Sequence, residues 1–350
     1  NLAWALATLE VPDAALLRAI CGELSARLGH LARRAVPAAR RALLAMSLTR
    51  LVWALHLAGA CCDDVLVGVR SALLRIGRAL DAARLPAAAA RAPMRELPAT
   101  PRSSSSLSGE PEVVLALPDR LVVLKPPNWQ VDEDDSSDAG HLLSGYLQAI
   151  DHRQQWSILH DTSHHRGFLH RLDVPSSGLL LVALTYEAFW DLKLQLAVGL
   201  LERDYTVLCR GWFPPARSRI VTRLRVDAER ACAVVCPRGK PSSTRVKVAA
   251  HLQRRAVALS LLDLRIDTGR MHQIRAHLAH VAHPVVGDGR YAASTTQEAD
   301  EEWCPRHFLH RHRLGFRDLA GGPEAAEVPL PPMLSAALEA LKPRVGPLGG

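Results

Sequence analysis

The segment from Phe168 to Leu184 places a carboxylate where it could do chemistry. Its sequence, FLHRLDVPSSGLLLVAL, contains a His-Arg-Leu-Asp run that ends at Asp173, then a Pro-Ser-Ser-Gly turn and an apolar run. The apolar run predicts a buried strand, which puts Asp173 at the edge of a protein core. A carboxylate in such a position must be solvated, paired with a cation, or functional.

Three further sequence motifs in the same part of the chain combine basic, aromatic and turn residues. They are LVVLKPPNWQVD (121–132), RDYTVLCRG (203–211) and DTGRMHQIRAHLAHVAHPVVGDGRY (267–291). Each has an ordinary structural explanation when it is taken alone. Lys125 can be a surface charge at a strand end, Tyr205 a core aromatic, and GRMHQIRAH the polar face of a helix.

In this order the words resemble the motifs of the RluA-type family of RNA pseudouridine synthases. The family's H-R-L-D word, followed by Thr-Ser-Gly and a run of Leu, corresponds to residues 170–181. Its K-P and K-x-Y words correspond to residues 125–126 and 203–205. Its T-G-R-x-H-Q-I-R-x-H-L word corresponds to residues 268–278. The resemblance covers about residues 112–342.

The resemblance implies a catalytic site made of Asp173, Tyr205 and Arg275. Asp173 would be the essential carboxylate, acting as a nucleophile toward the sugar or the base, or as the base that removes a sugar proton. The sequence leaves these roles open. Arg275 would be its buried partner and would keep the carboxylate ionised. Tyr205 would stack on the detached uracil and relay the proton that C5 loses.

Four further residues are expected to bind RNA or to help flip the base. Arg171 would enter the RNA and occupy the space that the target base leaves, because a base must leave its stack before it can be turned. Arg270 and His272 would contact phosphate or support their loop. Lys125 would brace the floor of the site. The chemistry requires no cofactor and no metal, so neither is expected.

Several positions depart from the family pattern and leave a second interpretation open. The protein could instead be an RNA-binding protein whose synthase-like domain is catalytically weak or inactive. Retention of Asp173, Tyr205 and Arg275 favours the active enzyme. The departures are Asn128 for Gly, Ser176 for Thr, Arg203 for Lys, Met271 for Thr and Ala282 for Gly.

The elements that must position these residues indicate an α+β catalytic domain. EVVLAL and RLVVLKPP predict a hairpin, and further short runs predict more strands. Helical patterns fall at about 139–150, 186–201 and 271–282. Many strands with few helices, in no regular βαβ order, predict a mixed, mainly antiparallel sheet. Residues 308–316 and 329–341 resemble the family's last strand and final helix.

The N-terminal quarter of the chain has a helical texture. Leu, Ala and Arg recur there at helical spacing, and an offset of 49 residues aligns Leu2 and Trp4 with Leu51 and Trp53. This predicts an all-α helical-repeat segment, similar to the repeats of organellar RNA-binding proteins. An ordinary helical bundle with chance similarity is the alternative.

These observations predict four parts of the chain. They are a helical-repeat segment over 1–84, a flexible linker rich in Ala, Pro and Ser over 85–111, the catalytic domain over 112–342 and a tail over 343–350. The chain begins at Asn1 rather than Met, so we expect the repeat segment to be truncated at its N-terminus.

Composition and charge suggest the partner and the compartment. A formal net charge of +8 favours an anionic partner such as RNA, although a compositional preference for Arg would also explain it. Seven Cys without a paired spacing favour a reducing, intracellular compartment, and the repeat resemblance adds mitochondrion or plastid to cytoplasm and nucleus. No apolar run reaches the length of a membrane span. The expected partner is rRNA or tRNA, which the motifs do not distinguish.

Overall fold

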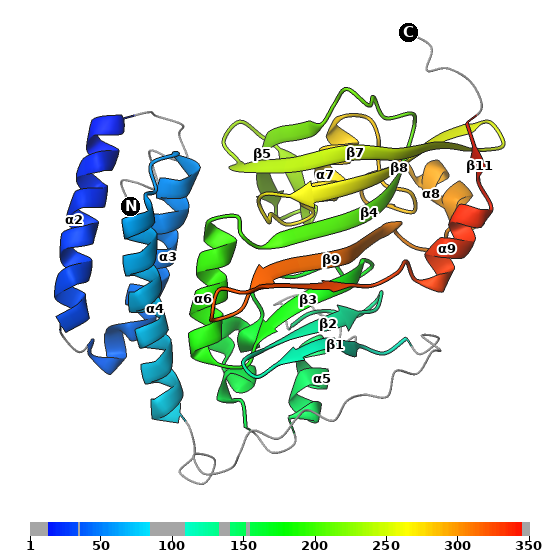
Figure 1. Cartoon of the computed structure of the whole chain (residues 1–350). Helices are drawn as coiled ribbons and strands as arrows, with labels where there is room; N and C mark the ends of the chain where they lie inside the picture. Colours follow the sequence, from blue (N-terminus) through cyan, green and yellow to red (C-terminus); the bar gives the residue numbers. More distant parts are fainter. Residues whose placement is uncertain (1–12, 34–35, 85–108, 133–140, 152–154, 345–350) are drawn as a thin grey trace.

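The computed structural model describes residues 13–33, 36–84, 109–132, 141–151 and 155–344. In Figure 1, the helical layer at the chain's N-terminal end packs against α6, which lies between this layer and one long twisted sheet. The helices are α2 (Ala14–Arg33), α3 (Ala38–Leu57), α4 (Asp63–Arg84), α5 (Leu143–Ile150), α6 (Tyr186–Ala197), α7 (Gln273–His280), α8 (Ser294–Glu301) and α9 (Pro332–Glu339), with 3-10 turns η2 (Ser157–His160) and η3 (Thr162–Gly167).

The sheet is mixed and mainly antiparallel, as the sequence predicts. Its strand order is β1-β2-β3-β9-β4-β8-β7-β5-β6, with β10 paired to β9 and β11 to β7. The parallel pairing between strands is that of β3 with β9, where Ser177 is opposite His310. The strands are β1 (Glu112–Leu117), β2 (Arg120–Lys125), β3 (Ser177–Ala183), β4 (Glu202–Arg210), β5 (Arg219–Asp227), β6 (Cys232–Val235), β7 (Lys240–Arg254), β8 (Val257–Ile266), β9 (Leu309–Arg317), β10 (Pro323–Glu327) and β11 (Lys342–Pro343).

Strand β3 explains why the apolar run after Asp173 does not alternate with polar residues. Side chains of a strand point alternately to its two faces, and both faces of β3 are covered. Leu179 and Leu181 enter the core shared with α6, whereas Leu180 and Val182 enter a second core on the opposite face. The loop before β3 is therefore attached to one of the most deeply buried strands of the protein.

The expected elements around the site are present. The β1–β2 hairpin forms with antiparallel pairing, and α5, α6 and α7 lie within or close to the three helical patterns. The run at 308–316 forms β9, which lies in the middle of the sheet between β3 and β4. Helix α8 and strand β10 were not predicted from the sequence.

The N-terminal helices are packed tightly onto the sheet domain. Leu73 and Ile76 of α4 belong to the same hydrophobic core as residues of α6 and β3. The Asp81 carboxylate accepts hydrogen bonds from the backbone N–H groups of Tyr186 (2.8 Å) and Glu187 (3.0 Å), the first two residues of α6. A carboxylate at a helix N-terminus satisfies donors that the helix itself leaves open. The helical layer thus stabilises α6 as well as covering it.

The helical-repeat interpretation remains a prediction. Helices α2 and α4 begin at Ala14 and Asp63, which differ by the same 49-residue offset. However, Leu2 and Trp4, on which the repeat depends, lie outside the described residues, as do most of the expected linker and most of the tail. No helix of the described residues is long and apolar enough to cross a membrane. All seven cysteines are free thiols.

Gly77 makes the contact between α4 and α6 possible, which gives a test of the helical layer. A Cβ at Gly77 would lie 2.4 Å from the Glu187 Cα, so the helices would have to separate. We expect Gly77→Ala to lower the free energy of unfolding by about 1–3 kcal/mol in urea titrations. Gly22→Ala, on α2 with nothing within 4 Å of its Cβ, should instead raise that free energy by about 0.5–1 kcal/mol. Equal stability of both variants would contradict the packing described.

Candidate active site

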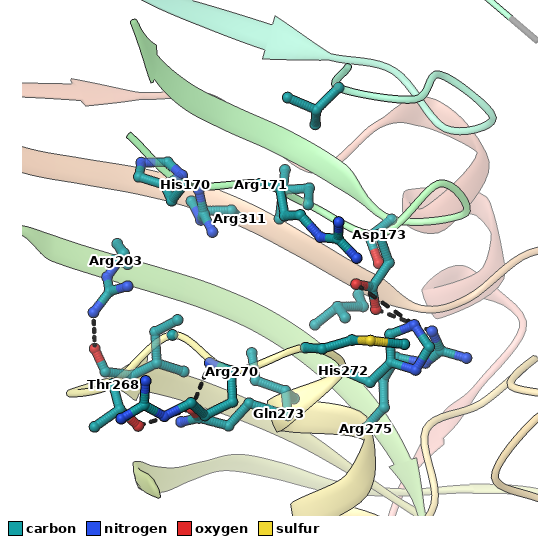
Figure 2. A pocket seen from close by; sticks show the side chains of 18 of the residues that line it. His170, Arg171, Asp173, Arg203, Thr268, Arg270, His272, Gln273, Arg275 and Arg311 are labelled. Carbon is teal, nitrogen blue, oxygen red and sulfur yellow. Dashed lines mark hydrogen bonds and ion pairs between the residues drawn. The ribbon is translucent and has the colours of Figure 1, made fainter. Parts of the chain in front are cut away.

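Asp173 lies in the short loop before β3, and hydrogen bonds connect this loop to the end of β2 and to the residues that follow it. Its carbonyl oxygen accepts the Ser176 N–H (3.1 Å), which closes a turn directly before β3. The carbonyl of Val174, the next residue, accepts the Asn128 N–H (2.8 Å) and the Lys125 ammonium (3.1 Å). The side chain of Asp173 is 17% exposed. It lines a pocket of about 1460 Å³, whose residues Figure 2 shows from close by.

Gly178 allows β9 to approach the end of this loop. Its φ is +130°, and a Cβ there would lie 2.4 Å from the Arg311 carbonyl oxygen. Only glycine adopts such a conformation without strain. The Gly of the sequence motif is therefore required by the backbone of β9, and this contact fixes Asp173 relative to Arg311.

Arg275 connects Asp173 to a second carboxylate. Its Nη1 donates to Asp173 Oδ2 at 3.0 Å, while Nε and Nη2 donate to Asp288 Oδ2 (2.6 Å) and Oδ1 (2.8 Å). Asp288 is fully buried. Burial alone would raise its pKa, but the hydrogen bonds and charge of Arg275 hold the pKa below the usual value for Asp. One guanidinium therefore joins a buried anion to an anion at the pocket surface.

His272 lies on the pocket side of this cluster. It is the residue before α7 and has a left-handed backbone, with φ +49°. Its Nε2 is 3.9 Å from Asp173 Oδ1, and its ring is edge-on to Tyr291. Burial lowers the pKa of His272, although the charge of Asp173 opposes this effect. Arg275, at 3.0 Å, is therefore a closer partner of Asp173 than His272, at 3.9 Å.

Tyr205 enters the pocket from β4, in the centre of the sheet. Its hydroxyl accepts a hydrogen bond from Arg311 Nη2, and the Arg311 guanidinium lies over its ring at 4.8 Å from the centroid. Arg311 is itself held by the Leu179 carbonyl (2.9 Å) and by the His170 ring (2.9 Å). Arg311 covers one face of the tyrosine ring, so a base that stacks on Tyr205 would use the other face.

The structure brings together most of the residues predicted from the sequence. Asp173, Tyr205 and Arg275 line the same pocket with Arg171, Arg270 and His272. In Figure 2, Arg171 lies beside Asp173 on the same loop, and Arg270 lies at the far side of the pocket. The catalytic and RNA-binding roles of these residues are proposals.

Lys125 was grouped with the RNA-binding residues, and its position in the structure corrects this expectation. Lys125 is fully buried and is absent from the pocket lining. Its ammonium donates to the carbonyl oxygens of Pro126 (2.8 Å), Trp129 (2.8 Å) and Val174 (3.1 Å). These three hydrogen bonds brace the loop of Asp173, and burial lowers the pKa of Lys125 to about 7. This geometry agrees with the expectation that Lys125 braces the floor of the site. It does not agree with direct contact between Lys125 and RNA.

Two departures from the family pattern have a local explanation. Asn128, where Gly is usual, has φ +64°, a conformation that Asn tolerates better than other non-glycine residues. Arg203, where Lys is usual, is buried and donates to the carbonyls of Ile266 (3.2 Å) and Asp267 (3.3 Å). Nothing in the structure explains Ser176, whose buried hydroxyl has no hydrogen-bond partner among the described residues.

Sequence reasoning missed Asp288 and Arg311. Both lie in words that the motif comparison covered, GDGRY and FLHRHRLGF, but neither received a role. A signal for Asp288 exists in the chemistry of Arg275, because a buried guanidinium has five N–H donors and Asp173 alone cannot satisfy them. Arg311 has no such signal, since it reaches Tyr205 only because β9 lies beside β4.

Comparison with known proteins places the chain in a family. Residues 119–280 match the family model described as RNA pseudouridylate synthase. The chain is 30% identical over 249 residues to an uncharacterized RNA pseudouridine synthase of Mycobacterium bovis, over 71% of this chain and 78% of that protein. The chain therefore belongs to the RNA pseudouridine synthase family, of the RluA type.

Particular relatives are ribosomal synthases. The chain is 32% identical over 235 residues to ribosomal large subunit pseudouridine synthase D of Neisseria meningitidis, over 65% of this chain, and spans 60% of the length of that protein. Among solved structures, human RNA pseudouridylate synthase domain containing 1 aligns with a TM-score of 0.48 and 25% identity, covering 69% of this chain and 91% of that chain.

The two carboxylates that share Arg275 should differ sharply in their contribution to stability. Asp288→Asn removes a buried partner from a buried cation, so we expect the free energy of unfolding at pH 7 to fall by about 3 kcal/mol. Asp173→Asn, at the partly exposed carboxylate, should change it by less than about 1 kcal/mol. Urea unfolding of both variants measures this. A larger loss for Asp173→Asn than for Asp288→Asn would contradict the arrangement.

The loss of stability caused by Asp288→Asn should also depend on pH. Because the pKa of Asp288 is lowered in the folded state, its stabilising contribution is present above the pKa of the unfolded chain, about 3.9. It is lost as the pH falls through the lower folded-state value. The stability difference between the wild type and Asp288→Asn should therefore be constant above about pH 5 and shrink in stronger acid.

Proposed function

We propose that this protein isomerises uridine to pseudouridine in RNA, with Asp173 as the catalytic carboxylate. The observation that carries the proposal is the pairing of Asp173 with the buried Arg275 at the surface of a large pocket. Family membership supports it. The chain spans only part of its ribosomal relatives, so its activity is inferred from its own site.

The charge of the pocket suits a nucleic acid. Ten Arg and Lys residues line it against three Asp, including Asp173 itself. Such a surface attracts a phosphodiester backbone and speeds its association. The cations are Arg50, Arg171, Lys193, Arg203, Arg230, Lys240, Arg270, Arg275, Arg290 and Arg311.

The position of Asp173 requires the target uridine to leave its stack. The carboxylate is recessed among pocket residues and only 17% exposed, so it cannot touch a base or sugar inside an RNA helix. Arg171 is an exposed residue of the same loop, next to Asp173 in the view of Figure 2. It is placed to enter the RNA and to occupy the space that the flipped base leaves.

The reaction breaks the N1–C1′ bond, turns the uracil and forms a C5–C1′ bond. N1 gains a proton and C5 loses one, so the product is an isomer of the substrate. Asp173, hydrogen-bonded to Arg275, acts on the sugar or the base or removes a sugar proton. Tyr205 holds the detached uracil against its ring, and its hydroxyl, hydrogen-bonded to Arg311, takes part in moving the C5 proton.

Structured rRNA is the first substrate to test. Relatives bear the names of ribosomal large subunit synthases, and tRNA is the second substrate to test. Both RNAs present uridines in loops from which a base can be flipped at low cost. Unmodified transcripts of large-subunit rRNA and of tRNA are therefore the appropriate substrates.

Replacing Asp173 tests the proposed function. The wild type should produce carbodiimide-dependent reverse-transcriptase stops at specific uridines of one of these transcripts, and Asp173→Ala should produce none. RNA affinity of the variant should stay within about threefold of the wild type, because the carboxylate contributes no attraction to phosphate. If the wild type binds RNA but gives no stops on any transcript, the protein is an RNA-binding protein and the enzymatic proposal fails.

Tyr205 variants separate the roles of its ring and its hydroxyl. RNA with tritium at uridine C5 releases the label to water when C5 bonds to C1′, which gives a rate. We expect Tyr205→Phe to lower kcat about 10²-fold with little change in KM, since only proton transfer is affected. Tyr205→Leu should lower kcat further, because the stacking surface is lost as well. An unchanged kcat for Tyr205→Phe would exclude the hydroxyl from the reaction.

A further inference from the structure

One wall of the pocket comes from the N-terminal helical layer rather than from the catalytic domain. Thr49, Arg50 and Trp53 of α3 line the pocket together with the loop that follows β8. Residues three and four positions apart lie on the same side of a helix, so these three side chains form one face. The family match begins only at residue 119, and this wall therefore lies outside it.

Helix α3 is fixed in place and does not behave as a separate arm. Val52 and Leu55, which do not line the pocket, are fully buried in the core shared with α4 and α6. Arg41, nearer the start of α3, donates to the Ala79 carbonyl of α4 at 3.1 Å. A helix anchored in this way presents its pocket face at a constant position relative to Asp173.

Trp53 holds Arg270, which belongs to the loop between β8 and α7. The Arg270 guanidinium lies over the Trp53 ring, 5.6 Å from its centroid, and its Nε donates to the Pro241 carbonyl at 3.2 Å. Nη2 of Arg270 is buried and has no hydrogen-bond partner among the described residues. A buried donor of a charged group without a partner is costly, so this site is arranged for an acceptor from a ligand.

The chemistry of this wall selects a phosphodiester backbone. Helix α3 contains three Arg and no Asp or Glu. Arg50 is exposed, one turn before Trp53, and forms no ion pair within the described part of the chain. Together with Arg270 it presents two cations to a pocket in which cations already exceed carboxylates. Phosphate oxygens are the acceptors that satisfy arginines in such a setting.

We propose that α3 forms part of the RNA site, beside the catalytic centre. Arg50 binds a backbone phosphate of the strand next to the target uridine. Trp53 is a positioning residue, which holds the Arg270 guanidinium at the pocket so that it binds the same backbone. This inference rests on the proposed function for the identity of the ligand, and it gives the N-terminal helices a direct part in RNA binding.

The first test compares two exposed arginines of α3. Arg50→Ala removes a cation from the pocket wall, whereas Arg40→Ala removes one from the same helix at a position that does not line the pocket. The probe is a fluorescein-labelled RNA stem-loop with uridines in its loop, and anisotropy gives Kd over a series of salt concentrations. Arg50→Ala should raise Kd about tenfold and reduce the slope of log Kd against log salt by about one.

The control and the kinetics make the test decisive. Arg40→Ala should leave the slope unchanged, and tritium release by Arg50→Ala should show a raised KM with kcat unchanged, because Arg50 would bind the backbone equally in the ground state and the transition state. Equal effects of the two substitutions on Kd and slope would overturn the proposal. Since binding is scored separately from product formation, a wild type that binds RNA but makes no pseudouridine would defeat the proposed function and leave this inference standing.

A double-mutant cycle tests the positioning role of Trp53. If Trp53 acts through Arg270, the variant carrying both Trp53→Leu and Arg270→Gln should bind RNA as Arg270→Gln does alone. Trp53→Leu should also reduce the salt slope by about one, and Trp53→Phe should restore it, since phenylalanine keeps an aromatic face for the guanidinium. Additive losses of affinity in the double variant, or no change of slope in Trp53→Leu, would overturn the positioning role.

Discussion

The site depends on how one buried guanidinium is shared between two carboxylates. Arg275 makes two hydrogen bonds to the fully buried Asp288 and one to Asp173. The buried pair fixes the plane of the guanidinium, because a bidentate contact allows little rotation. The remaining N–H then determines where the Asp173 carboxylate lies. Asp288 is therefore a positioning residue, and Asp173 is free to face the pocket without carrying the cost of an unpaired buried cation.

The sheet fixes the positions of the other site residues. Strand β3 is buried on both faces, and Gly178 lets β9 approach within a distance that no other residue permits. Asp173, Tyr205 and Arg311 consequently come from three neighbouring strands or their loops, although they are far apart in the sequence. Helix α3 lines the same pocket through Thr49, Arg50 and Trp53, and it packs on α4 and α6. The inferred RNA wall thus shares a hydrophobic core with Leu179 and Leu181 of β3, whereas Tyr205 belongs to the core on the other face of that strand.

The sequence predicted those parts of the site that local pattern can encode. The strand after Asp173, the helix that carries Arg275 and the hairpin that carries Lys125 follow from periodicity and turn residues, and the motif words placed Asp173 with Arg275. The burial of Lys125 was not readable, since a lysine at a strand end is usually exposed and only the three carbonyls around it explain its position. The contacts of Arg311 with Tyr205 and of Trp53 with Arg270 depend on strand order and helix packing, which no local pattern specifies.

The most direct test of this account is the rate of a single turnover in Asp288→Asn. Asp288 lies outside the pocket lining, so RNA affinity should stay as in the wild type. If the fixed orientation of Arg275 is what makes Asp173 catalytic, tritium release from C5-labelled RNA at saturating enzyme should slow about 10²-fold in the folded variant. If the wild type and the folded Asp288→Asn variant released tritium at the same rate, this result would contradict the claim that the shared guanidinium positions the catalytic carboxylate.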